Sequence, residues 1–162
     1  MTTRWLAVLA LVVLATPVVS AGELEDEGPV RSTYGVTFGL PGGFNLVTSQ
    51  YFGGKLGVRG SVGYVPGREG DHMFGAQIGV VRKANEAGRT LYDVSVVAGY
   101  HELITASSLT NGGIWRYVGV TGSIATRGFF LEAGLTVGSG DYRNPQGTLH
   151  LGYLFSVNRS EK

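Results

Sequence analysis

The segment from Gly128 to Val157 holds two runs of alternating residues, joined by a polar connection that contains Gly and Pro. Such alternation is typical of β-strands whose two faces meet different surroundings, because successive side chains point to opposite sides of a sheet. The bulky apolar face carries Phe129, Leu131, Ala133, Leu135 and Val137 in the first run and Leu149, Leu151, Tyr153, Phe155 and Val157 in the second. The opposite face is mostly small or polar. The segment therefore predicts an antiparallel hairpin with two unlike faces.

Two structures satisfy this pattern. In a soluble barrel the apolar face points inward and the polar face meets water with long charged side chains. In a transmembrane barrel the apolar face meets lipid, and the inward face is small and polar enough to fit the lumen. The second face here is mostly Gly, Ser and Thr, with only an occasional charge. We therefore expect the apolar face to meet lipid, and a soluble periplasmic lipocalin-like barrel with the faces inverted is the alternative.

The same alternation repeats along the chain from Arg31 onward, in runs of about ten residues separated by turns. Six runs precede the hairpin: Arg31 to Leu40, Phe44 to Phe52, Lys55 to Val65, His72 to Lys83, Thr90 to His101 and Ile114 to Ala125. The faces of the run from Phe44 to Phe52 are not assigned, because both are about equally apolar. Most of the long or Pro/Gly-rich connections fall on one side, as expected for external loops opposite short periplasmic turns. The sequence therefore predicts an all-β, eight-stranded antiparallel up-and-down transmembrane barrel.

The two ends of the chain differ from this pattern. Residues 1–21 have a basic start, an apolar run and small residues at Val19 and Ala21, which predicts a cleaved signal peptide. Residues 22–30 are acidic and aperiodic, and we expect a flexible periplasmic lead-in. The barrel is expected over residues 31–158, with a short C-terminal tail at 159–162. Without Arg4 the chain keeps twelve basic and twelve acidic residues, which does not favour nucleic-acid binding. There is no cysteine, so disulfides and thiolate metal sites are excluded.

With these features, residues 31–157 resemble the small eight-stranded outer-membrane barrel proteins of Gram-negative bacteria, the OmpA/OmpX-like class. The resemblance implies an outer-membrane location, contact with outer-membrane lipids and the barrel assembly machinery, and a monomer. The last strand of such barrels often carries an assembly signal, which His150, Gly152, Phe155 and Val157 match here. Aromatic residues toward the ends of runs fit interfacial belts at the headgroup level. The expected belt consists of Tyr34, Tyr64, Tyr92, Tyr100, Trp115 and Tyr153.

Three charged residues lie about four positions past a predicted periplasmic turn, on the third, fifth and seventh runs: Arg59, Asp93 and Glu132. Because strands rise about 3.3 Å per residue, these side chains are expected in one layer of the lumen. We predict a structural ion cluster, with Lys83 as a further member, that plugs the lumen. The alternative is a catalytic carboxylate pair beside an arginine. An interior of eight strands is just filled by side chains, which favours the cluster.

Function is expected to be non-enzymatic: an envelope-structural or loop-binding barrel that is not an open pore, since porins need about twice the strands. The main alternative is an outer-membrane lipid hydrolase or acyltransferase that uses a Ser/His/acid set at the external rim. Its candidates, none with specific spacing, are His72, His101, Glu102, Ser107, Ser108 and Asp141. No cofactor pocket, phosphate loop or metal-spaced cluster is visible in the sequence.

Overall fold

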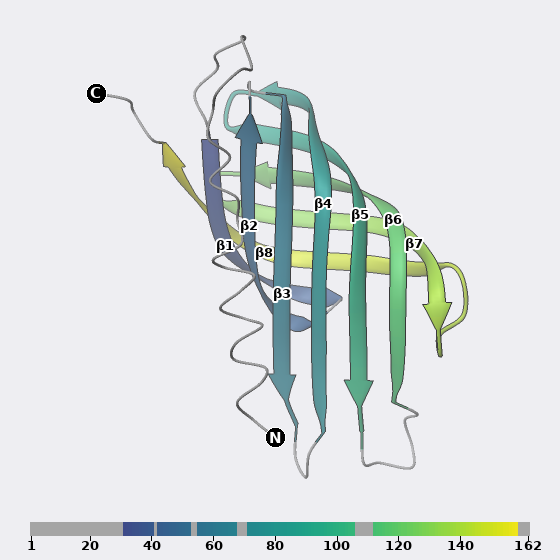
Figure 1. Ribbon diagram of the computed structural model, residues 1–162. Coiled ribbons are helices and arrows are strands. Elements are labelled where there is room, and N and C mark those ends of the chain that lie inside the picture. Colours follow the sequence, from purple (N-terminus) through teal and green to yellow (C-terminus); the bar gives the residue numbers. More distant parts are fainter. Residues whose placement is uncertain (1–30, 41, 53–54, 68–70, 106–111, 159–162) are drawn as a thin grey trace.

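Eight antiparallel strands form one closed barrel in the computed structural model (Figure 1), with neighbours in chain order and β8 paired back to β1. The predicted all-β up-and-down fold is confirmed. The structure describes residues 31–40, 42–52, 55–67, 71–105 and 112–158, with the backbone alone for 156–158. The predicted signal peptide, acidic lead-in and C-terminal tail lie outside these residues. The strands are β1 Arg31–Leu40, β2 Gly43–Phe52, β3 Leu56–Pro66, β4 His72–Ala87, β5 Thr90–Ile104, β6 Gly113–Thr126, β7 Phe129–Gly140 and β8 Gln146–Asn158.

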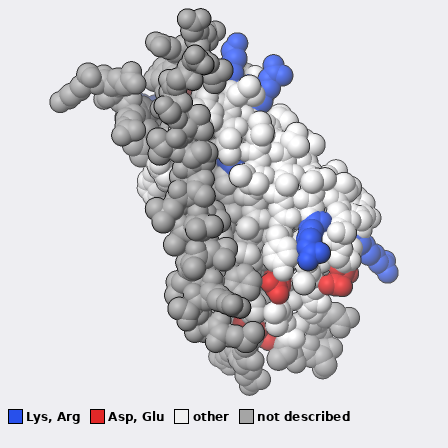
Figure 2. Space-filling view, viewed as in Figure 1, with Lys and Arg blue, Asp and Glu red and all other residues white. Residues whose placement is uncertain are grey.

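The outer surface of the barrel is apolar. Side chains such as Ile78, Val96 and Leu135 are 60–67% exposed, whereas the buried side chains include many Ser, Thr and charged residues. Figure 2 shows a largely uncharged band on this face, with charged side chains toward its ends. A surface of this kind suits hydrocarbon and would be unstable in water. The bulky apolar face therefore points outward, and the inverted lipocalin-like alternative is wrong.

The unassigned strand β2 follows the same rule. Asn45, Val47, Ser49 and Tyr51 point into the barrel and are at most 4% exposed, whereas Phe44 on the other face is 53% exposed. Pairing with β1 and β3 decides this facing, because each inward residue of β2 lies opposite inward residues of both neighbours. The composition of β2 alone does not distinguish its faces.

The connections divide the barrel into two unlike ends. Residues 53–55, 88–89 and 127–128 connect strands at one end, called the turn end here; longer connections at 67–71, 105–112 and 141–145 lie at the other, the loop end. The turn Gly88–Arg89 is tighter than the sequence suggested, because β4 continues to Ala87 through a β-bulge between Lys83 and Asn85. Gly88 has φ +61°, which suits a two-residue hairpin turn.

A charge placed in the middle of the outer face tests whether that face meets lipid. We expect Val96→Arg to lower the free energy of unfolding in lipid vesicles by about 2–4 kcal/mol, because a cation at the bilayer midplane is poorly solvated. Denaturant titration followed by Trp fluorescence measures this. Val96→Leu serves as the control and should stay near the unaltered protein. A cost of about 0.5 kcal/mol or less for the Arg variant, as at a watered surface, would contradict a lipid-facing position.

Candidate functional site: the lumen ion cluster

A buried ion cluster crosses the lumen toward the turn end. Arg59 on β3 places Nη2 2.8 Å from Asp93 Oδ2 on β5 and Nη1 2.8 Å from Glu132 Oε2 on β7. All three side chains are 5% exposed or less. The structure thus brings together the three residues that the sequence placed at one height. A single guanidinium lies between two carboxylates from different strands and connects opposite parts of the wall.

Every N–H group of the Arg59 guanidinium has an acceptor. Besides the two carboxylates, Nε donates to Ser49 Oγ at 3.0 Å, Nη1 to Ser123 Oγ at 2.9 Å and Nη2 to Tyr51 Oη at 3.0 Å. The Phe130 ring lies with its centroid 5.1 Å from Arg59 Cζ, within range of a cation–π contact. A guanidinium has five N–H donors in fixed directions. The position is therefore built for arginine, since lysine has only three donors and a different geometry.

The cluster continues through Glu132 to neighbouring inward-facing residues. Glu132 Oε1 accepts a hydrogen bond from Gln77 Nε2 at 3.2 Å and lies 3.3 Å from His150 Nδ1. Gln77 Oε1 accepts from the Tyr117 hydroxyl at 3.0 Å. At the other carboxylate, the Tyr51 hydroxyl donates to Asp93 Oδ2 at 2.6 Å. Paired charges and hydrogen bonds are what make buried ions tolerable in a dry interior.

Strand register explains why these side chains meet. Asp93 lies directly opposite Ser123, Ser123 opposite Glu132, and Glu132 opposite His150, so the four form a row across β5, β6, β7 and β8. On the other side of the barrel, Arg59 lies opposite Ser49. Directly opposed residues on an antiparallel pair share one face, so each row delivers its side chains to one level of the lumen.

Lys83 does not join the cluster, which corrects the prediction. Its ammonium lies 2.7 Å from Glu86 Oε2 at the turn end, and its side chain is 24% exposed. Glu86 in turn lies 3.3 Å from Arg31. A long lysine side chain extends to the watered rim when a partner is there, because ammonium hydration is then kept. Arg59 already pairs with both buried carboxylates from within the lumen.

Aromatic side chains fill the lumen above the cluster, toward the loop end. Val97, Trp115 and Tyr117 pack together with exposures of 3–5%, and Tyr142 packs against them. The Tyr117 ring lies over Gly99, where an added Cβ would come 2.3 Å from the Tyr117 hydroxyl oxygen. Glycine at this position leaves the space that the ring occupies. Charges at one level and aromatic rings at the next therefore fill the lumen.

The predicted aromatic belt needs one correction. Tyr34, Tyr64, Tyr92 and Tyr153 point outward and are 38–53% exposed. Tyr100 also lies on the outward face, half-buried against Phe74, and its hydroxyl donates to Glu102. Trp115 instead points into the lumen and is 4% exposed. The alternation on β6 places Trp115 on the same face as Tyr117, so its period already indicated the lumen.

The predicted assembly signal lies on β8. Phe155 points outward and is 58% exposed, whereas His150 points inward and contacts Glu132. At Gly152 an added Cβ would come 2.0 Å from the Val36 carbonyl oxygen on β1, so glycine lets β8 approach β1 closely. The backbone of Val157 belongs to the same strand and pairs with Ser32. His150 and Gly152 therefore have structural contacts of their own, whatever their part in assembly.

Several cluster members were missed from the sequence. Gln77, Tyr117, Ser123 and His150 stand on faces that alternation marks as inward, so height along the strand was the usable signal. Tyr51 and Ser49 lie on β2, whose faces the composition leaves open. Apart from the assembly-signal match at His150, none of the six belongs to a motif. Most of their contacts join residues that are more than twenty positions apart in the chain, so the sequence near each residue does not reveal them.

The candidate residues for lipid chemistry at the loop end each contact a different partner. His101 packs against Tyr142 at 5.8 Å between centroids, and its Nδ1 has no hydrogen-bond partner. Asp141 Oδ2 accepts a hydrogen bond from the Ile114 amide at 2.8 Å, and Glu102 accepts one from Tyr100. His72 packs against Tyr64 at 5.9 Å. Ser107 and Ser108 lie outside the described residues.

Burial raises the pKa of the Tyr142 hydroxyl in the β7–β8 connection above its ordinary value, and the Asp141 carboxylate raises it further. This hydroxyl therefore stays protonated at neutral pH.

No group of three or more His, Asp or Glu side chains in the described part of the chain is placed to hold a metal ion. The same residues contain no helix long and apolar enough to cross a membrane.

The closed sheet, the apolar exterior and the filled lumen define an eight-stranded transmembrane β-barrel. No protein-family model matches the chain, and no curated protein matches it significantly in sequence. Among solved structures, it is similar to Ail, the attachment invasion locus protein of Yersinia pestis, crystallised with the heparin analogue sucrose octasulfate. The match has 15% identity and a TM-score of 0.33, and covers 78% of this chain and 97% of that one.

Removing the central cation tests whether the cluster stabilises the barrel. We expect Arg59→Leu to lower the free energy of unfolding by about 3–5 kcal/mol, because Asp93 and Glu132 would remain buried without a partner. Urea titration in detergent micelles measures this. Arg143→Leu, at an exposed loop position, is the matched control, with an expected change of about 0.5 kcal/mol or less.

A further variant separates charge pairing from lost volume. Arg59→Leu combined with Asp93→Asn and Glu132→Gln should recover much of the lost stability, since no buried charge is then left unpaired. An unchanged unfolding midpoint for Arg59→Leu alone would refute a stabilising cluster.

Proposed function

We propose that this chain is a non-enzymatic integral protein of the Gram-negative outer membrane, whose barrel stabilises the envelope and is closed to passage. The observation that carries the proposal is the filled lumen. Arg59 and its two carboxylates occupy one level, and Trp115 and Tyr117 occupy the next. An eight-stranded barrel has an interior only wide enough for such side chains. Transport of a solute would require breaking the buried charge pairs of Arg59.

In this proposal the turn end faces the periplasm and the loop end faces the exterior, as the connection lengths favour. Any binding role then belongs to the loop end, where the longer connections 67–71, 105–112 and 141–145 lie. Outer-membrane lipids contact the apolar exterior, with the outward tyrosines at the headgroup level. A cleaved signal peptide at residues 1–21, delivery through the barrel assembly machinery with β8 as the recognised strand, and a monomeric state complete the proposal.

A lipid-modifying enzyme is the second candidate. The observation in its favour is the unpaired Nδ1 of His101 at the loop end, since a catalytic base needs a free nitrogen. Against it, Glu102 and Asp141 both accept hydrogen bonds from groups other than this imidazole. A catalytic triad needs an acid that orients the histidine.

Conductance measurements test the closed lumen. We expect the purified protein to give no current steps in planar lipid bilayers beyond those of a detergent control, because the ion cluster and the aromatic layer occupy the lumen. The protein should also fractionate with outer membranes and change its gel mobility on heating. Reproducible steps from folded, heat-modifiable protein would contradict the closed barrel.

A lipase assay decides between the two functions. We expect purified protein to release no fatty acid from phospholipid or lipopolysaccharide, and His101→Ala to behave like the unaltered protein. Fatty-acid release that disappears in His101→Ala, while the heat-modifiable fold is kept, would replace the structural role with an enzymatic one.

A further inference from the structure

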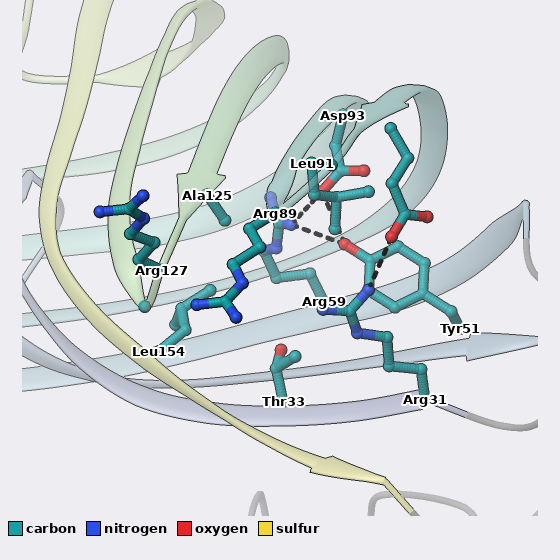
Figure 3. A pocket seen from close by; sticks show the side chains of 13 residues that line it. Arg31, Thr33, Tyr51, Arg59, Arg89, Leu91, Asp93, Ala125, Arg127 and Leu154 are labelled. Carbon is teal, nitrogen blue, oxygen red and sulfur yellow. Dashed lines mark hydrogen bonds and ion pairs between the residues drawn. The ribbon is translucent and has the colours of Figure 1, made fainter.

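A cavity of about 310 Å³ opens at the turn end of the barrel, on the side of the ion cluster away from the aromatic layer. Arg59, Asp93 and Tyr51 belong to the cluster and form the inner part of its lining. Three further arginines line it from separate places on the rim, as Figure 3 shows: Arg31 at the start of β1, Arg89 in the β4–β5 turn and Arg127 in the β6–β7 turn. The proposed closed-barrel function makes no use of this cavity.

The charges that line the cavity are unbalanced. Four arginines face two carboxylates, Asp93 and Glu86. Asp93 is paired with Arg59 at 2.8 Å, and Glu86 with Arg31 at 3.3 Å and Lys83 at 2.7 Å. Among the described residues, no carboxylate is paired with Arg89 or Arg127. The rim therefore carries positive charge that the described barrel does not neutralise, and such a site favours an anionic occupant.

The cavity wall also has an apolar part. Leu91, Ala125 and Leu154 line it between the rim and the ion cluster. A small inorganic anion would leave this surface without a contact. An occupant that carries both carboxylates and an aliphatic side chain would match the lining, because arginines pair with carboxylates and apolar surface is removed from water.

We propose that this cavity is a binding site for an acidic peptide, and that its occupant is the chain's own segment Gly22–Val30. The segment reads GELEDEGPV, with four carboxylates, one leucine and no basic residue. It leads directly into Arg31, which lines the cavity. Both the charge and the apolar content of the segment complement the site.

The connection to β1 favours this occupant over a free anion. Nine residues can extend over about 30 Å, which is more than the segment needs to turn back into the mouth of the barrel that it precedes. A short tether gives an effective concentration in the millimolar range. A free anion of equal affinity would have to exceed that concentration to compete. Because the rim is solvent-exposed, the interaction weakens as salt rises.

Fluorescence anisotropy tests the proposal on the chain from residue 22 to 162. The chain has no cysteine, so Gly22→Cys carries a single fluorophore at the far end of the segment. At low salt in non-ionic micelles we expect high anisotropy, because the docked segment moves with the barrel. The double variant Arg89→Gln/Arg127→Asn should lose this anisotropy and approach the value of a labelled free peptide. Asparagine is chosen because residue 127 has φ 50°.

Two further variants make the test specific. Lys55→Gln/Arg82→Gln removes the same charge from the same end without touching the cavity lining and should leave the anisotropy unchanged. Arg89→Glu/Arg127→Asp combined with Glu23→Lys/Glu25→Arg/Asp26→Lys/Glu27→Arg reverses the charge on both partners and should restore the anisotropy. Heat-modifiable gel mobility verifies that each variant is folded.

The proposal is overturned if the label is as mobile in the unaltered chain as in the Arg89/Arg127 variant, or if the Lys55/Arg82 control releases it equally. A mobile label together with calorimetric binding of inorganic phosphate would assign the cavity to an external anion instead. These experiments do not measure conductance. The closed-barrel function is therefore tested separately, by the bilayer recordings.

Discussion

Backbone pairing is the constraint on which this structure depends. Hydrocarbon offers no hydrogen bonds, so every N–H and C=O within it must find a partner in the protein. The sheet meets this requirement by closure, with β1 paired to β8 from Arg31–Asn158 to Leu40–Leu149. Closing only eight strands leaves a narrow lumen, and that narrowness explains the glycines, the small polar residues and the single layer of charges inside.

The ion cluster follows from the same geometry. Burying a charge in a narrow lumen is unfavourable because the charge loses hydration. Hydrogen bonds from each N–H of Arg59 and its two ion pairs offset this loss. An apolar lumen of equal volume would be no less stable by this reasoning, so we attribute to the cluster a role in specifying register. The row from Asp93 to His150 exists only when β5 to β8 pair as they do. A slip of one residue would turn these side chains toward lipid.

Because side chains fill the middle of the lumen, the two ends are the parts that meet water. The loop end carries the longer connections and the His101–Tyr142 contact. The turn end carries short hairpins and a cavity whose rim arginines outnumber its carboxylates. Charged groups gather there because water solvates them at the ends and hydrocarbon excludes them between. The envelope-structural role and the docking of an acidic segment both remain proposals that rest on this division.

The amino-acid sequence by itself determined the strand count, the two faces of most strands and the common height of Arg59, Asp93 and Glu132, because period-2 alternation is a local property of each strand. Only the tertiary structure decided the facing of β2, the extension of β4 to Ala87, the rim position of Lys83 and the partners contributed by Gln77 and His150. Those features depend on which strands lie opposite one another and on where a long side chain finds water. Alternation within one strand carries no information about its neighbouring strands or about where water reaches a side chain.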